Sequence, residues 1–194
     1  MVVPGILMVW AAATASASAW WTGDWGLDPS ASDDPTQAIQ QAYVGTAVSG
    51  ASEASKLSPD GGEVDVEANR TKLLYQVLGL LGVSGRITLV EEGDDAVSLA
   101  WSGVAPMHLP VGNKWTKVAR VDEDHEGYRI RVREDGDRLI VERRLNATTL
   151  TETLLSQPNP GELVVVVRVD GSALDPGVEF RRVYRSMGEA AAAP

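Results

Sequence analysis

The sequence predicts a mainly β protein: an antiparallel meander β-barrel of about nine or ten strands, with two helices inserted after the first strand. From Gly85 onward, apolar and polar residues alternate with a period of two, which is typical of strands with one dry and one wet face. Gly- and Asp-containing pairs separate these runs at short spacing, as hairpin turns do. Such strands close into a barrel or pack as a sandwich, because an open sheet leaves two long edges exposed.

Composition limits the function. The 194 residues are 44% apolar and 23% charged, which predicts one globular domain over residues 20–186, followed by a disordered tail over 187–194. The net charge is −10, so the surface repels phosphate backbones, and nucleic acid is not an expected partner. The chain has no cysteine, which excludes disulfides, thiolate nucleophiles and cysteine zinc sites.

The N-terminus resembles a secretion signal. Residues 1–19 carry no charged side chain and end in small residues, with overlapping Ala-x-Ala cleavage sites between Ala15 and Ala19. Cleavage there predicts a mature chain that starts near Ser18 or Trp20, is periplasmic or secreted, and has no stable membrane span. An uncleaved membrane anchor is the alternative.

Two helices are expected in an insertion over residues 35–83. The Asp-Asp-Pro triplet at 33–35 is a helix start signal, and the apolar residues of 36–48 follow helical spacing. A second helix is predicted over 70–82, too short to span a bilayer, from the spacing of Leu73, Leu74, Val77, Leu78 and Leu81. We expect this helix to cover the barrel mouth; a membrane-docking or lid helix is the alternative.

The remaining elements are strands. The first contains Trp25, and the clearest alternation joins Tyr128, Ile130 and Val132 on one face to three arginines on the other. The later strands are predicted near residues 86–92, 96–101, 114–121, 127–134, 138–145, 148–155, 162–169 and 178–186.

Both ends of the chain resemble a known group of proteins. A Gly-x-Trp on the first strand, at Gly23 and Trp25, followed by helices and a long meander, resembles the calycin superfamily of lipocalins and fatty-acid-binding proteins. The resemblance implies that Trp25 plugs the closed end of the barrel. The segment "ELVVVVRVDGSALDPGVEFRRVYRS" looks like the last hairpin of a fatty-acid-binding protein, which implies that Arg182 and Tyr184 bind a ligand carboxylate. Because the chain is rich in Ala, Gly, Asp and Arg, a bacterial envelope relative is expected.

Strand geometry allows this binding role. A period of two puts Phe180, Arg182 and Tyr184 on one face of the last strand. A guanidinium and a phenol both donate hydrogen bonds, which a buried carboxylate needs. The alternative is that Arg182 or Arg185 stacks on Trp25 and closes the barrel base.

Signs of catalysis are scarce. The sequence has no nucleophile elbow, zinc-protease motif, phosphate loop or dinucleotide fingerprint. His125 lies among four acids in residues 122–126, a group that could bind a divalent cation but is more typical of an exposed turn. His108, near two prolines, is expected on a loop with no nucleophile beside it. We therefore predict no enzyme, no cofactor and no metal.

The main functional hypothesis is an exported binding protein that holds an apolar ligand, such as a fatty acid or other lipid, inside the barrel. The alternative is a ligand-free structural or protein-interaction module of the cell envelope, because small barrels can be filled by their own side chains. An enzyme on the same scaffold is the third possibility. The sequence does not indicate the oligomeric state.

Overall fold

The structure of the protein is a computed structural model. It describes residues 19–50, 71, 74–75, 77–79, 81, 85–93, 95–101, 105–119, 127–156, 159, 161–171 and 174–188, without the side chains of 43–50 and 175–176. The predicted leader, apart from its last residue, lies outside the described residues, as do His125 and residues 189–194 of the predicted tail. The domain boundaries therefore stay predictions.

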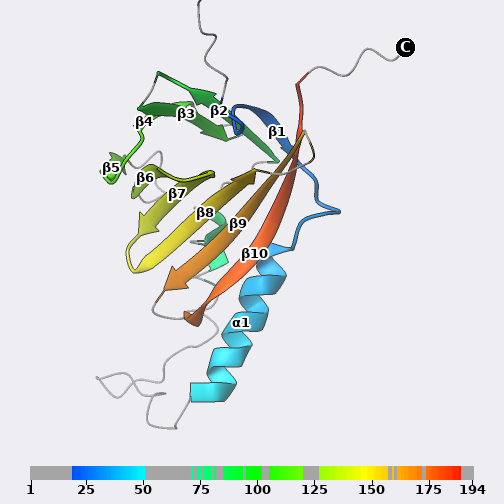
Figure 1. Ribbon diagram of the computed structural model, residues 1–194. Helices are drawn as coiled ribbons and strands as arrows, with labels where there is room; N and C mark the ends of the chain where they lie inside the picture. The colour runs from blue at the N-terminus through cyan, green and yellow to red at the C-terminus, as the bar shows by residue number, and fades with distance from the viewer. Residues whose placement is uncertain are drawn as a thin grey trace, which may run out of the picture.

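Within the described residues, ten strands form a single antiparallel sheet in the order β4-β3-β2-β1-β10-β9-β8-β7-β6-β5 (Figure 1). Apart from the step between β1 and β10, neighbours in the sheet are neighbours in the chain, so the sheet is a meander. The strands are β1 (Gly23–Leu27), β2 (Arg86–Glu91), β3 (Ala96–Trp101), β4 (Met107–Pro110), β5 (Thr116–Val118), β6 (Tyr128–Asp135), β7 (Arg138–Leu145), β8 (Thr148–Ser156), β9 (Glu162–Gly171) and β10 (Leu174–Ser186). The predicted mainly β meander is confirmed.

Strand β4 is the element that the sequence did not predict. His108 lies on it and is exposed, so the expected loop is wrong. Pro106 precedes the segment and Pro110 is its last residue, which hides the strand pattern. However, β4 is at the edge of the sheet, where a proline without an N–H group is tolerated.

The sheet curls into a nearly closed barrel. Its two edge strands, β4 and β5, do not pair with each other. Instead Val111, directly after β4, forms a bridge with Val132 of β6, and the N–H of Gly112 donates to the Val132 carbonyl at 2.7 Å. The Tyr128 hydroxyl also lies 4.0 Å from the Met107 sulfur across the same seam. These contacts hold the two ends of the sheet together.

Two tight turns fix the register of the central strands. Asp135 pairs with Arg138, which leaves a two-residue turn whose Gly136 has a φ of 62°. Between β7 and β8, Asn146 takes the same left-handed region with a φ of 53°. Two-residue hairpin turns require a positive φ, and Gly and Asn adopt it at the lowest cost.

The segment after β1 continues along β10 and leads into the helix. The N–H of Asp28 donates to the Val183 carbonyl at 2.8 Å, and the N–H of Asp33 donates to the Arg181 carbonyl at 2.8 Å. Helix α1 (Pro35–Gly50) starts where predicted, because the carboxylate of Asp34 accepts the N–H of Thr36 at 2.8 Å. Figure 1 shows α1 starting beside the middle of β10 and running downward from there.

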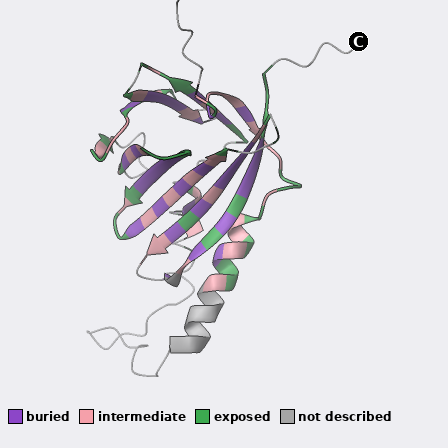
Figure 2. Ribbon diagram, in the orientation of Figure 1, coloured by how far each residue is buried: buried purple, intermediate pink, exposed green. Residues whose placement is uncertain are grey.

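One apolar cluster joins the barrel interior to the helices. Along β8, buried and more exposed positions alternate (Figure 2), and the members of the cluster on β2, β3 and β6 to β10 face inward. Ile39 of α1 belongs to this cluster, and so do Val77 and Leu81, which lie in the predicted second helix and are helical where described. Among the described residues, no helix is both long and apolar enough to cross a membrane.

Candidate functional site: charged groups inside the barrel

Three charged side chains and one phenol lie on the inner face of the barrel. Arg143 of β7 alternates with the buried Val141, and Glu152 of β8 sits between two buried leucines. Arg182 and Tyr184 follow the buried Phe180 at spacings of two along β10. Because side chains two apart in a strand share a face, all four face the interior with the apolar core. We call these four residues the interior polar cluster.

Arg143 and Glu152 form a buried ion pair through Nη2 and Oε2. Their side chains are 2% and 3% exposed, so the pair has almost no contact with water. The Arg143 guanidinium also lies over the ring of Trp101, with its carbon 3.9 Å from the ring centroid. A cation on an aromatic face and beside a carboxylate is stabilised from two sides.

Arg182 and Tyr184 form the other half of the cluster. The Arg182 guanidinium carbon lies 5.3 Å from the centroid of the Tyr184 ring. Burial raises the pKa of the Tyr184 hydroxyl far above its usual value, although the nearby positive charge of Arg182 lowers it in part. Glu152 and Arg143 also act on this pKa, so their charges lie near Tyr184. The phenol therefore stays protonated and is available as a hydrogen-bond donor.

Several polar atoms of the cluster are buried without a hydrogen-bond partner in the described part of the chain: Nε of Arg143, Oε1 of Glu152 and the hydroxyl of Tyr184. Leaving such a group unpaired costs about 1–3 kcal/mol, and more when it is charged. A void of about 10 Å³ touches Glu152 and Trp101, between β2, β3 and β7 to β9. It is large enough for about one water molecule.

The net charge of this interior is positive. Of the four cluster members, Arg143 and Arg182 are cationic and only Glu152 is anionic. A charge in a dry interior is costly unless a counter-charge is bound there. The cluster therefore carries one more positive than negative charge, and it offers donors from a guanidinium and a phenol.

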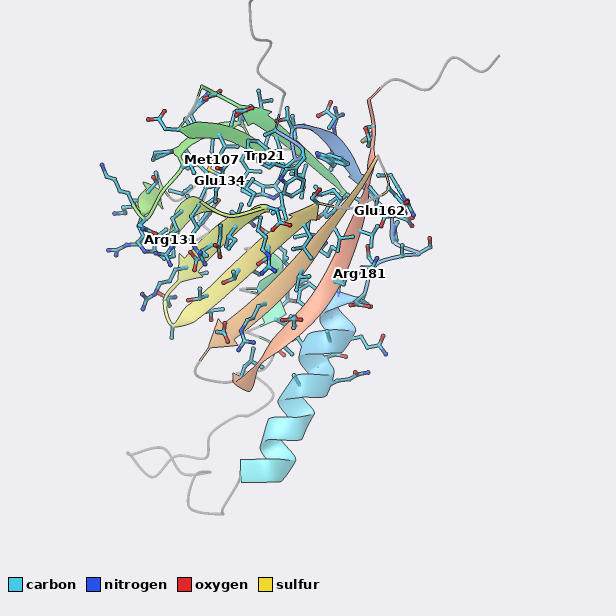
Figure 3. The ribbon with its side chains drawn as sticks, viewed as in Figure 1. Trp21, Met107, Arg131, Glu134, Glu162 and Arg181 are labelled. Atoms are coloured by element: carbon cyan, nitrogen blue, oxygen red, sulfur yellow. The ribbon has the colours of Figure 1, made fainter. Side chains whose placement is uncertain are left out.

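The other predicted site residues are placed as follows. Phe180 is buried beside Arg182 on the inner face. Trp25 is buried, and its indole N–H donates to the Trp21 carbonyl at 2.9 Å; Trp21 and Met107 lie between the β1–β4 layer and the β6–β10 layer (Figure 3). Which of these residues contact a ligand stays a prediction.

Arg185 needs a correction. The alternative in which Arg185 stacks on Trp25 does not hold, because Arg185 forms ion pairs on the outer face, to Asp28 at 3.3 Å and to Glu162 at 2.6 Å. The reason is the strand period: Tyr184 faces inward, so its neighbour Arg185 faces solvent, with its side chain 55% exposed.

Sequence reasoning missed Arg143 and Glu152. A signal was available, because each of these charged residues occupies a position that the period of two assigns to the dry face of its strand. A charge at an inward position is rare unless it is paired, so two such positions on neighbouring strands indicate a buried pair.

No metal site is found among the described residues, where no three metal-ligating side chains come together. His108 instead contacts Glu92 through Nδ1 at 2.7 Å on the exposed edge of the sheet. The absence of enzyme activity stays a prediction.

Comparison with solved structures finds proteins of similar chain path. The fatty acid transporter REP1-NXSQ has a TM-score of 0.48 and 10% identity over 87% of this chain and 96% of its own. The Echinococcus granulosus fatty-acid-binding protein 1 has a TM-score of 0.48 and 11% identity over 87% and 98%. A secretory abundant heat soluble protein 4 from Ramazzottius varieornatus has a TM-score of 0.46 and 15% identity over 88% and 96%.

No protein-family model matches the chain, and no curated protein matches it in sequence. The fatty-acid-binding protein in the comparison belongs to the same group as the resemblance noted at the two ends of the sequence. At these TM-scores and identities the likeness concerns the path of the chain, and the ligands in those names belong to those proteins alone.

Proposed function

We propose that the protein is a carrier that holds an apolar molecule with an anionic head group, such as a fatty acid, inside the barrel. The observation that supports it is the interior polar cluster: two guanidiniums and a phenol set against a single carboxylate in a dry interior. The net positive charge of the cluster would attract a ligand carboxylate, and the Tyr184 hydroxyl, which has no partner among the described residues, would donate to it.

The rest of the inner wall suits the apolar part of such a ligand. Strands β9 and β10 present Val165, Val167 and Phe180 to the interior, all of them buried. Burial of a hydrocarbon chain stabilises a complex by about 0.8 kcal/mol for each methylene group. Because the void holds only about one water molecule, a long ligand has to displace interior side chains or the helical segment that carries Val77 and Leu81.

The test is a titration of delipidated protein with a long-chain fatty acid and, separately, with its methyl ester. We expect the acid to bind and the ester to bind at least about tenfold more weakly, since the ester has no charge to pair with the interior arginines. Tyr184→Phe removes only a hydroxyl without a partner, so it should keep the fold and weaken binding of the acid.

A matched pair of variants separates the two faces of β10. Arg182→Leu removes an inward cation and should abolish the preference for the acid, whereas Arg181→Leu removes an exposed, outward cation and should bind as the wild type does. A folded protein that binds neither compound would contradict the proposal. Equal binding of acid and ester would contradict the role of the head group.

The small void favours a second candidate, a barrel filled by its own side chains that acts as a ligand-free interaction module. Tyr75, which is 71% exposed and lies in the segment of the predicted second helix, would then be part of the partner surface. This candidate predicts no binding of acid or ester by folded protein, and it predicts unchanged stability after treatment that removes lipid.

Export is a separate proposal and rests on the sequence of residues 1–19. We expect the mass of the mature protein, purified from its natural source, to correspond to a start near Ser18 or Trp20. An intact N-terminus in mature protein would contradict it.

A further inference from the structure

A groove lies at the rim of the barrel, where β6 begins and β7 ends. Its volume is about 210 Å³, and basic side chains dominate it. The lining residues are Lys117, Gly127, Tyr128, Arg129, Arg144 and Asn146.

Its three cations form one row across three strands. Lys117 of β5 is the register partner of Arg129 of β6, which is in turn the partner of Arg144 of β7. The next residue of β6, Ile130, is fully buried in the core, so this row faces outward. Register partners on one face lie side by side, and like charges placed in this way repel each other and destabilise the sheet.

The neighbouring arginines of β6 differ from Arg129 because each has an anionic partner. Arg131 and Arg133, which share the outer face with Arg129, both pair with Glu142 of β7, Arg133 at 3.5 Å. By contrast, the structure shows no ion pair for Lys117, Arg129 or Arg144 with any residue that it describes. Two cations of this strand thus have a built-in counter-charge, while the third is flanked by two more cations.

We propose that this groove binds the phosphate group of a small molecule. Two arginines and a lysine around one hollow offer the forked donors and the charge that a phosphate takes up. The groove is a hollow and the protein carries a net charge of −10, so a dissolved phosphate compound fits it better than an anionic membrane surface. The site is independent of the interior polar cluster, because Arg143 and Arg182 face the other side of the sheet.

The test uses the full chain and inorganic pyrophosphate as the probe, with sodium chloride at matched ionic strength as the reference. We expect saturable binding in calorimetry, and NMR shifts confined to the amides of residues 117, 127–129 and 144–146. Arg129→Gln and Arg144→Gln should each weaken binding about fivefold or more. Arg138→Gln, at the opposite end of β7 and 56% exposed, should leave it unchanged.

Four results would overturn the proposal. Shifts that sodium chloride reproduces would show a bulk salt effect, and equal loss in Arg138→Gln would show general attraction to anions. Absence of pyrophosphate binding would show that the groove is not a phosphate site, for example because carboxylates of the chain pair with these cations in solution. Binding to phosphatidic acid vesicles without binding to pyrophosphate would overturn the choice of a dissolved ligand. Fatty acid titrations of Arg129→Gln distinguish a failure of the phosphate site from a failure of the carrier function, since they should match those of the wild type.

Discussion

The buried pair of Arg143 and Glu152 allows the sharpest prediction about the barrel interior. Removing one member leaves the other charge uncompensated in a dry site, which destabilises a protein by about 3–5 kcal/mol. We therefore expect Glu152→Leu and Arg143→Met to lower the free energy of unfolding by this amount each. Arg143→Met also loses the stack on Trp101, which contributes about 0.5–2 kcal/mol.

The double variant is the informative one. Apolar side chains of similar volume at both positions remove both charges together, so we expect Arg143→Met/Glu152→Leu to lie within about 2 kcal/mol of the wild type. The coupling energy from this double-mutant cycle should then be at least about 4 kcal/mol.

Urea unfolding followed by tryptophan fluorescence measures these energies, and thermal unfolding checks them. For a domain of this size, 1 kcal/mol corresponds to about 2–4 °C, so each single variant should melt roughly 6–20 °C below the wild type. Arg168→Gln breaks an exposed pair with Asp170 and serves as the control, with an expected loss of no more than about 1 kcal/mol. Single variants as stable as this control, with additive effects in the double variant, would refute the reasoning, because the pair would then be in contact with water.

Three further predictions concern the scaffold. Asp34→Ala removes the helix cap and should lower the free energy of unfolding by about 0.5–2 kcal/mol in urea titrations; an unchanged midpoint would show that α1 starts elsewhere. Burial raises the pKa of Glu142, but the hydrogen bond and charge of Arg131, together with a second arginine, lower it further, so the net pKa is below its ordinary value of 4.5. Because the pKa is lower in the folded state, the pair of Glu142 and Arg131 stabilises the protein above pH 4.5, and this contribution is lost as the pH falls through the folded pKa. In carboxyl NMR, the Glu142 pKa should rise in Arg131→Gln. An unchanged Glu142 pKa would count against the pair. Gly177→Ala would place a Cβ 2.8 Å from a backbone oxygen of β9 and should lower the free energy of unfolding by about 1–3 kcal/mol. The control is Gly79→Ala, on a helix with open space around it, which should be neutral or stabilising. Equal effects of the two substitutions would contradict the close approach of β9 to Gly177.

The sequence predicted the strands well where their two faces differ in polarity. β6 is the clearest case, since its apolar residues face the core and its arginines face solvent, and its predicted bounds differ from the observed ones by one residue. Strand β4 was missed because it is short and flanked by prolines, and only its position at the sheet edge makes a proline acceptable there.

The candidate site was predicted in part. The period of two placed Arg182 and Tyr184 on the inner face correctly, because local geometry alone decides which side of a strand a residue occupies. Arg143 and Glu152 depend on the register between β7 and β8, which brings their side chains together. Register is a tertiary property, so the sequence could place both charges on the dry face, but the contact between them followed only from the structure.

The most direct test of the carrier function is a carbon NMR titration of delipidated protein with a fatty acid labelled at its carboxyl carbon. The proposal predicts a separate bound resonance that does not titrate near the pKa of the free acid, because the interior cations keep the carboxylate ionised; this resonance should be lost in Arg182→Leu and retained in Arg181→Leu. If the folded protein gives no resonance other than that of free or self-associated acid, the proposal is contradicted.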